Sequence, residues 1–359
     1  MINVTQTFLP PQEEYQKILS ESWNKKWMTN RGVLVKRLEQ KLSSKLTINN
    51  VILTANGTLP LQLALRSLEA KGKEIITTPF SYVATSSAIV WEGYKPVYAD
   101  IDPEYLTIDE TKIEALINKN TVAILATHVF GNPCNIDAIE KIAKKHDLKI
   151  IYDGAHSFGV NYKGKALLSY GDMSTCSFHA TKIFHTGEGG CLVSKNDVVH
   201  KKLLQSHNFG HVTSNTFEHV GINAKMSELS GAMGLAVFPY FDTIILERKK
   251  VVDLYNNLLD FSRLKKINLR EDTEWNYAYY PVIFNSEEVL LKVVEELNKN
   301  EIFPRRYFSP SLNMLPYVDY IACEESESVS KRVLCLPLFV ELSFESIKQI
   351  SFIVNSIVS

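Results

Sequence analysis

The sequence predicts an α/β protein with a mostly parallel central sheet, helices on both faces of that sheet, and a smaller α+β domain towards the C-terminus. From residue 74 to residue 153, apolar segments of strand length alternate with helical segments, which is typical of a parallel sheet covered by helices. The 359 residues exceed the usual size of one hydrophobic core, and 45% of them are hydrophobic. We therefore expect a large domain at 1–238, with an N-terminal arm, and a small domain at 239–359.

The predicted elements up to about residue 68 are the N-terminal arm with its helix, two further helices and one strand. Pro10-Pro11 is a helix start signal for the arm. A further helix should follow residue 58, because apolar side chains recur at helical spacing at Leu61, Ala64, Leu65 and Leu68. The other elements predicted before residue 60 are helices over 11–23 and 33–46 and a strand over 51–54.

The middle of the chain supplies most of the predicted sheet. Its strands are expected over 75–78, 97–101, 122–127, 150–153, 173–178 and 190–194. Its helices are expected over 82–91, 109–118, 136–146 and 196–207. A polar loop over 210–221 then reads as exposed.

A long helix over 225–259 should connect the two domains, bent or divided at Pro239, where proline removes a backbone donor. The small domain should then contain strands over 279–284, 302–307 and 333–336, and helices over 287–298 and 344–357.

Composition excludes several classes of protein. The 39 basic and 40 acidic side chains give a formal net charge of −1, so no overall field attracts nucleic acid or an anionic membrane. The five cysteines form no C-x-x-C pair, no run of about 18 apolar residues occurs, and no His, Cys or Asp cluster has metal-ligand spacing. We expect a cytoplasmic protein without nucleic acid, membrane or metal.

Lys182 is the candidate reacting amine, since it follows a predicted strand and precedes the turn Gly187-Glu188-Gly189-Gly190. By position alone it could be an ordinary surface lysine. Asp153, however, ends an earlier apolar strand, at the edge of the sheet where ligands of open α/β folds bind. A lysine and a carboxylate at one edge suit pyridoxal 5′-phosphate, which needs a covalent anchor and a partner for its ring nitrogen.

Asn56-Gly57-Thr58 lies between a predicted strand and a predicted helix. Free backbone N–H groups and the helix dipole make such a position a seat for phosphate. An ordinary helix cap explains the same residues equally well when they are considered alone.

Three motifs in this order resemble a known family. They are Asn56-Gly57-Thr58, Asp153-Gly154-Ala155-His156, and Ser177-Phe178-His179-Ala180-Thr181-Lys182 followed by the glycine turn. The chain is similar in them to the DegT/StrS-type nucleotide-sugar aminotransferases, pyridoxal phosphate enzymes of the aspartate aminotransferase fold, also called fold type I. The likeness runs from Trp27-Met28-Thr29-Asn30 to Phe303-Pro304-Arg305-Arg306-Tyr307-Phe308.

The resemblance implies a cofactor site with Lys182 as the catalytic residue. Phe80 would stack on the ring, although by its position alone it could be a core aromatic. His156 would lie near the phenolic oxygen, and Asn223 would reach the phosphate in a partner subunit, which makes the protein a homodimer with shared active sites. The cofactor-binding residues so implied are Gly57, Thr58, Phe80, Asp153, His156, Ser177, Lys182 and Asn223. The cofactor would be pyridoxal 5′-phosphate, with pyridoxamine 5′-phosphate as its aminated form.

The family further implies the reaction. Glutamate would donate an amino group to a nucleotide-linked keto-6-deoxy sugar, most similarly to the enzymes that convert dTDP-4-keto-6-deoxy-D-glucose to dTDP-4-amino-4,6-dideoxy-D-glucose, for O-antigen or another surface glycan. Candidate substrate contacts are Trp27, Thr29, Arg31, Tyr82, Arg305 and Tyr307. A 3-keto sugar or a cyclitol as substrate, and a non-catalytic regulatory protein of the same fold, remain alternatives.

Overall fold

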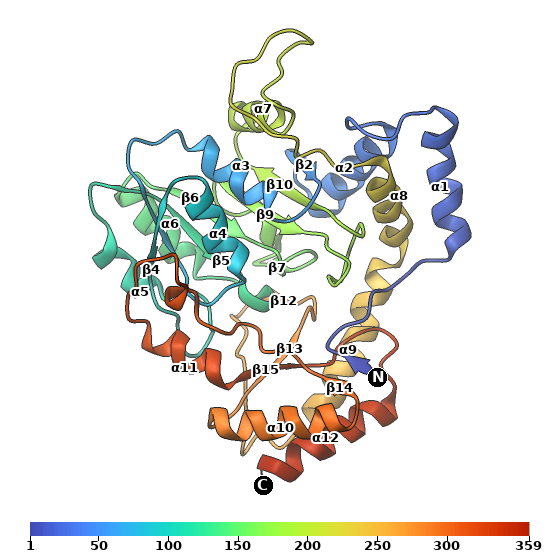
Figure 1. Cartoon of the computed structure of the whole chain (residues 1–359), viewed down its shortest axis with the longest axis vertical. Coiled ribbons are helices and arrows are strands. Elements are labelled where there is room, and N and C mark those ends of the chain that lie inside the picture. Colours follow the sequence, from blue (N-terminus) through green and yellow to red (C-terminus); the bar gives the residue numbers. More distant parts are fainter. Residues whose placement is uncertain (359) are drawn as a thin grey trace.

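A seven-stranded sheet forms the centre of the larger lobe in the computed structural model, which describes residues 1–358 (Figure 1). The strands lie in the order β2 (Val51–Thr54), β10 (Gly190–Ser194), β9 (Met173–Ser177), β6 (Lys149–Asp153), β5 (Thr121–Thr127), β3 (Glu74–Thr77) and β4 (Lys95–Tyr98). Pairs from β9 through β4 are parallel, whereas β10 is antiparallel to both of its neighbours. The predicted α/β class is confirmed, with a mixed sheet.

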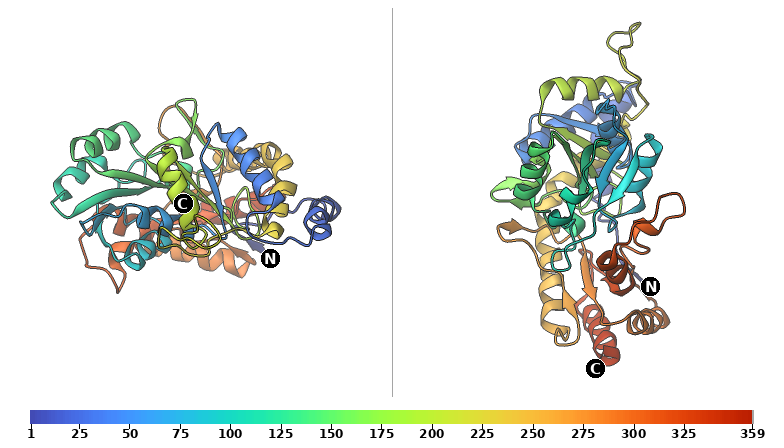
Figure 2. Two further views of the ribbon diagram at one scale, coloured as in Figure 1. Left: turned by 90° about the horizontal axis from the view of Figure 1, so that it is seen from above. Right: turned by 90° about the vertical axis from the view of Figure 1, so that its left-hand side faces the viewer.

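Helices cover both faces of this sheet (Figure 2). The helices of the larger lobe are α1 (Gln12–Asn24), α2 (Val33–Leu46), α3 (Leu59–Ser67), α4 (Val83–Trp91), α5 (Glu110–Ile113), α6 (Ile136–Lys145), α7 (Asp197–Ser206) and α8 (Glu228–Val237). Because successive strand residues point to opposite faces, Ile75 packs towards α3, α4 and α7, while Ile76 packs towards α6. At the other end of the sheet, Leu53 packs against α2 and α8.

Local sequence fixes where several helices begin. The side chains of Asn135, Asn196, Ser227 and Ser286 each accept a hydrogen bond from an N–H of the first turn that follows. Such caps satisfy donors that the helix itself leaves unpaired. In α2, Leu34, Leu38 and Leu42 recur on one face and are fully buried.

The smaller lobe lies below the larger one in Figure 1 and has its own core. A three-stranded antiparallel sheet combines β11 (Lys265–Lys266), β13 (Tyr280–Ile283) and β15 (Val333–Leu336). The helices of this lobe are α9 (Phe241–Leu258), α10 (Glu287–Lys299), α11 (Glu324–Arg332) and α12 (Phe344–Val358). Val282, Leu290, Leu334 and Ile350 are buried together between them.

The chain crosses between the lobes in both directions. Strand β1 (Ile2–Asn3) of the arm pairs with β14 (Ile302–Phe303), so the N-terminus lies beside the smaller lobe. Strand β12 (Thr273–Glu274) pairs with β7 (Asn161–Tyr162) of the larger lobe, which also pairs with β8 (Lys165–Ala166). A domain boundary at residue 238 stays a prediction. Two short strand pairs, β1 with β14 and β12 with β7, cross it.

The predicted division of the long helix is confirmed. A 3₁₀ turn, Phe238–Tyr240, carries Pro239 and separates α8 from α9. The helical stretch Glu228–Leu258 has the length and mean hydropathy, 1.5, of a possible membrane span. It packs against α1, α2 and α12 within the fold, and 44% of its apolar window is buried there.

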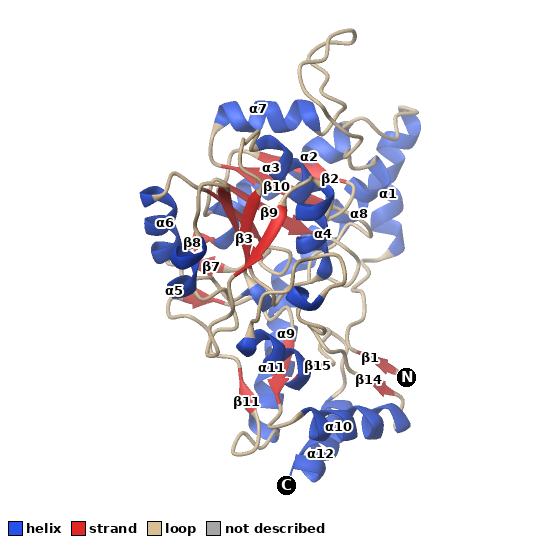
Figure 3. Ribbon diagram, turned by 60° about the vertical axis from the view of Figure 1, so that its left-hand side comes forward, coloured by secondary structure: helices blue, strands red, loops and turns tan. Residues whose placement is uncertain are grey.

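Two predicted elements differ from the structure, and several short elements were not predicted (Figure 3). The strand predicted over 302–307 is only the two-residue β14, because Pro304 cannot donate to a ladder. The helix predicted over 109–118 is the short α5 followed by a 3₁₀ turn at Glu114–Leu116. Helix α11 and the short strands β1, β7, β8, β11 and β12 were not predicted.

Candidate active site

A cleft of about 920 Å³, including its open mouth, lies where the carboxyl ends of β6 and β9 meet the smaller lobe. The larger lobe contributes most of the predicted polar groups to its walls. These are Asn56, Gly57, Thr58, Asp153, His156, Ser177 and Lys182. The smaller lobe contributes Tyr279, Arg305, Tyr307 and Phe308.

Asp153 is the last residue of β6 and is only 5% exposed. One carboxylate oxygen accepts a hydrogen bond from the Thr85 hydroxyl at 2.7 Å, and the other accepts one from the Ala155 N–H at 3.1 Å. Burial raises the pKa of Asp153, while these bonds and the nearby charge of Lys182 act in the opposite direction. Asp153 lines the cleft, so a cationic ligand group there can pair with its carboxylate.

Lys182 lies in the turn between β9 and β10. Its own N–H donates to the His179 carbonyl at 2.8 Å, and the Ala180 N–H donates to the Gly187 carbonyl at 2.7 Å, so the turn is closed by backbone bonds. The Lys182 ammonium donates to the hydroxyl of Tyr279 at 3.0 Å. Lys182 and Asp153 face one cavity, as their proposed roles require.

The Asn56-Gly57-Thr58 turn lies directly against β9. A Cβ at position 57 would lie 2.7 Å from the Cβ of Ser177, so glycine permits this close approach. The Asn56 side chain accepts the N–H groups of Thr58 and Leu59 at 2.9 and 3.0 Å. In the described part of the chain, the Gly57 N–H and the hydroxyl of Thr58 have no protein partner and face the cleft.

His156 lies in the cleft wall as a neutral imidazole. Its Nδ1 accepts the Phe130 N–H at 3.1 Å, which leaves the ring proton on Nε2. Burial, and then the charge of Lys182, holds the pKa of His156 well below its ordinary value. The imidazole lies 4.6 Å from the ring of Tyr279, between centroids.

The structure does not place Phe80 in the cleft. Phe80 is fully buried and packs edge-on against Phe130 and Phe308, with centroids 6.1 and 5.7 Å away. Tyr82, two residues later, lines the cleft and is 52% exposed. The aromatic residue of this loop that is open to a ligand is therefore Tyr82.

Four other candidates also lie outside the cleft of their own chain. Trp27 and Thr29 are exposed on the loop before α2. The guanidinium of Arg31 is occupied by Glu39, with Nη2 and Oε2 2.8 Å apart. Asn223 lies beyond the projecting loop, where its side chain accepts a bond from Lys225 at 2.6 Å.

The two neighbouring arginines of the smaller lobe differ. Arg305 lines the cleft, and its guanidinium lies 4.9 Å from the ring centroid of Tyr307. Arg306 instead bonds Glu287 at 2.7 Å and carbonyls of α11. Arg305 is therefore the arginine of this pair that can reach a ligand, together with Tyr307.

Sequence reasoning missed three residues that shape the site. Thr85 bonds Asp153 from the first turn of α4, Tyr279 bonds Lys182, and Phe308 lines the cleft beside Tyr82. Thr85 carries no local signal, because a threonine in a helix is common. The aromatic run Tyr277-Ala278-Tyr279-Tyr280 was the one available hint for Tyr279, and it read simply as a strand.

Comparison with known proteins agrees with this geometry. The chain is 37% identical to a dTDP-4-amino-4,6-dideoxy-D-glucose transaminase of Shigella dysenteriae, over 97% of each chain. It is also 37% identical to a transaminase of the same name from Escherichia coli, over 98% of this chain and 97% of that one. A solved structure of DesI in the presence of its TDP-sugar product superposes with a TM-score of 0.94, at 27% identity, covering 99% of this chain and 93% of DesI.

Residues 11–355 match the sequence model of one family. The match spans both lobes and includes Asp153, Lys182 and the motifs around them. The chain belongs to the DegT/DnrJ/EryC1/StrS aminotransferase family.

Proposed function

We propose that this protein is a fold type I, pyridoxal phosphate-dependent aminotransferase that moves an amino group from glutamate to a nucleotide-linked keto-6-deoxy sugar. The observation that carries the proposal is the pairing of Lys182 with Asp153 in one cleft. Asp153 is a buried carboxyl without a cationic partner in the described chain, and a protonated pyridine nitrogen would supply that partner.

The residues present fit each polar part of the cofactor. When bound, pyridoxal 5′-phosphate serves as an electron sink for the carbon that carries the transferred nitrogen. Lys182 offers an amine for its aldehyde, and Asp153 offers a carboxylate for its ring nitrogen. The Gly57 N–H and the hydroxyls of Thr58 and Ser177 are available to its phosphate.

The chain's own groups would then move the protons. Lys182 Nζ takes the proton from the α-carbon of glutamate and, in the second half of the reaction, delivers a proton to the sugar carbon that receives nitrogen. His156 stays neutral, so its Nε2–H can donate to the ring oxygen of the cofactor. Tyr82, open to the cleft, takes the ring-covering role that the sequence had suggested for Phe80.

The substrate that we propose is dTDP-4-keto-6-deoxy-D-glucose, with nitrogen added at C4. Support comes from the two 37% identical transaminases, whose names give the corresponding amino sugar. Arg305 is the cleft residue suited to a diphosphate, because its planar guanidinium can donate two parallel bonds. We propose that the enzyme works in the cytoplasm and that its product is used for an O-antigen or another surface glycan.

We also propose a homodimer in which Asn223 serves the partner's cofactor phosphate. The loop between α7 and α8 projects from the body of the protein at the top of Figure 1. It carries exposed apolar side chains, among them Phe217 and Val220 at 60% and 74% exposed. A second copy would cover them.

Two alternatives are supported less well. A GDP-linked sugar is suggested by a GDP-perosamine synthase of Vibrio cholerae, which is 30% identical over 93% of this chain and 94% of that one; 3-keto sugars and cyclitols belong with it as other substrates. A regulatory protein is suggested by a pleiotropic regulatory protein of Geobacillus stearothermophilus at 27% identity, over 94% of this chain and 93% of that one. The complete set of Lys182, Asp153 and Gly57 favours catalysis.

Two measurements test the proposal. The purified protein should take up pyridoxal 5′-phosphate, and borohydride should fix it on Lys182, as located by peptide mass spectrometry. Absence of that adduct would favour the regulatory alternative.

The loaded protein should then be incubated with glutamate and a panel of 4-keto and 3-keto sugars linked to dTDP or GDP, together with a cyclitol ketone. Product mass and NMR should identify dTDP-4-amino-4,6-dideoxy-D-glucose as the preferred product. Preference for another member of the panel would replace the proposed substrate.

A further inference from the structure

We propose that Tyr279 is a second catalytic residue, which fixes the reacting amine of Lys182 from the smaller lobe. This inference rests on the proposed function, because it assigns Tyr279 a part in the same amine chemistry. No motif pointed to Tyr279; its position in the fold does.

Tyr279 touches the reacting atom directly. Its hydroxyl oxygen accepts a hydrogen bond from Lys182 Nζ at 3.0 Å, and Nζ lies 5.5 Å from the centre of the phenol ring. The side chain is nearly enclosed, at 8% exposed, between the rings of His156 and Tyr307, whose centroids lie 4.6 and 5.3 Å away. The phenol oxygen is therefore a fixed point rather than a mobile surface group.

This bond determines which way the amine faces. A neutral lysine amine has two N–H bonds and one lone pair. If one N–H points at the Tyr279 oxygen, the lone pair and the second N–H are left for the cleft, where Asp153 and the sugar would lie. The same arrangement serves attack on an aldehyde and removal of a proton from carbon, because both use the lone pair.

Side-chain bonds to the backbone hold Tyr279 in this place. Arg248 of α9 is buried, 4% exposed, and donates to the carbonyls of Tyr277 and Ala278 at 2.8 and 2.7 Å. Burial lowers the pKa of Arg248 to about 10, so the guanidinium keeps its charge at neutral pH. Asn276 is fully buried and donates to the carbonyls of His156 and Phe158 at 2.8 and 2.9 Å.

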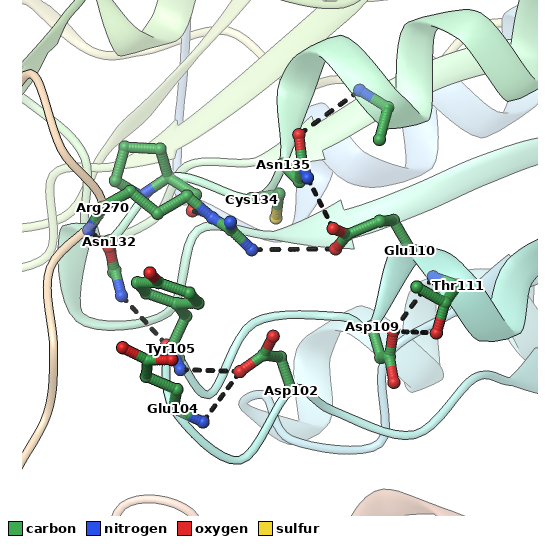
Figure 4. Close-up of polar contacts among 12 residues, drawn as sticks. Asp102, Glu104, Tyr105, Asp109, Glu110, Thr111, Asn132, Cys134, Asn135 and Arg270 are labelled. Atoms are coloured by element: carbon green, nitrogen blue, oxygen red, sulfur yellow. Dashed lines mark hydrogen bonds and ion pairs between the residues drawn. The ribbon is translucent and has the colours of Figure 1, made fainter.

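The segment that leads to Tyr279, residues 267–279, is also anchored further back (Figure 4). Arg270 lies over the ring of Tyr105, 4.2 Å from its centroid, and points towards Glu110, 3.7 Å away. Asn132 donates to the carbonyls of Tyr105 and Asn268, and its oxygen accepts the Arg270 N–H. The crossing segment is thus fastened to the larger lobe from both ends, which fixes the approach of Tyr279 to Lys182.

The adjacent tyrosine offers a matched control. Tyr280 is buried to the same degree, 5% exposed, but its hydroxyl bonds Asn256 and its ring lies in the core of the smaller lobe. Tyr279→Phe and Tyr280→Phe therefore each delete one buried hydroxyl while keeping the ring. Only the first should affect the amine.

Two readouts test the proposal on the full-length protein. The first is the rate at which cofactor-free protein captures pyridoxal 5′-phosphate, followed by absorbance, with the site checked by borohydride reduction and mass spectrometry. The second is kcat and KM for glutamate and the keto sugar. Tyr279→Phe should slow capture and lower kcat by roughly 10- to 100-fold, as expected when the hydrogen bond that orients the reacting amine is lost, and should leave KM within about threefold.

Each outcome decides the question. Tyr280→Phe should match the unmodified protein in both readouts; equal losses in both variants would indicate a packing effect and overturn the proposal. Unchanged capture or unchanged kcat in Tyr279→Phe would also overturn it, because a fixed amine serves both steps. If the unmodified protein captured the cofactor but transferred no amino group, the proposed function would fail, and the capture rates would still test Tyr279.

Discussion

The two walls of the cleft differ in how the fold holds them. On the larger-lobe wall, Asp153 and Ser177 are the last residues of neighbouring parallel strands, and Lys182 follows in a turn closed by backbone bonds. On the smaller-lobe wall, Tyr279 ends an irregular segment that the side chains of Arg248 and Asn276 hold. Arg305 lies outside the strands, where its backbone forms a single bridge to Cys335 of β15. The sheet therefore presents the groups that perform the chemistry, whereas packing of the second lobe presents the groups that orient it.

Because the larger-lobe wall presents the reacting groups, substitutions in that wall should cause the largest losses of activity. Lys182→Ala should lower kcat/KM by roughly 10⁴-fold or more, because it removes both the covalent anchor and the general base. Steady-state transamination measures the loss, and the variant should unfold at the same temperature as the unmodified protein.

Lys299→Ala is the control for this change, since Lys299 is an exposed lysine of α10 whose only recorded partners within residues 1–358 are neighbouring glutamates. Turnover by Lys182→Ala at a rate close to that of Lys299→Ala would exclude Lys182 as the reacting amine.

The next effect concerns the carboxylate. Asp153→Asn keeps the shape and the Thr85 bond but removes the charge that would face a protonated ring nitrogen. Removing one partner of a buried ion pair typically costs about 3–5 kcal/mol, so kcat should fall by roughly 10²- to 10⁴-fold. In Thr85→Val, which keeps the charge of Asp153 and deletes one hydrogen bond, kcat should fall by only about 10-fold.

A smaller loss of activity should follow when the segment behind the smaller-lobe wall is disturbed while the side chains that line the cleft are kept. Asn276→Ala leaves the carbonyls of His156 and Phe158 without a partner in the interior, and should lower the free energy of unfolding by about 2–4 kcal/mol. It should also lower kcat about 10-fold through Tyr279, while KM for the sugar stays nearly constant.

Asn268→Ala is the matched change on the same crossing segment, because the side chain of Asn268 is exposed and bonds Glu104. Its stability should change by less than about 0.5 kcal/mol. If both asparagine variants lost activity equally, the crossing segment would not position Tyr279 in the way we describe.

The same division explains what could be predicted from the sequence. Helix α2 and strand β10 have the predicted bounds, and the motifs at Asp153 and Lys182 lie in one cleft, because local periodicity and strand ends determine these features. Tyr279 could not be predicted, since its role depends on bonds from Arg248 and Asn276, which only tertiary packing brings together.

The stacking role that the resemblance implies for Phe80 stays a prediction, and the burial of its ring could not be predicted for a related reason. Phe80 and Tyr82 are both aromatic, both follow β3, and they are two residues apart in a loop, where no regular period assigns side chains to a face. Thr78 accepts the Phe80 N–H, and the Phe80 ring turns inward to Phe130 and Phe308. Helix α11 escaped prediction because its exposed face is rich in serine and charge, with only three buried residues, Ser326, Val329 and Ser330.

The smallest effect that we predict is a difference in thermal stability between the protein with Asp153 protonated and the protein with Asp153 ionised. In cofactor-free protein, burial raises its pKa, so the folded protein holds the proton more tightly than the unfolded chain does. This contribution to stability is complete below the ordinary carboxyl value of 3.8 and is lost as pH rises through 3.8 towards the raised folded value. Asp153→Asn should therefore unfold at a higher temperature than the unmodified protein at pH 7, and the advantage should vanish near pH 3.

Loading with pyridoxal 5′-phosphate should reverse this order at pH 7, because a carboxylate beside a protonated ring nitrogen gains a partner that asparagine cannot replace. Asp147→Asn, at an exposed position of the same lobe, should not show the reversal on loading. An Asp153→Asn variant that stayed the more stable protein after loading would mean that the cofactor brings no positive charge to this carboxyl. The sheet wall would then hold the cofactor by Lys182 and the phosphate seat alone.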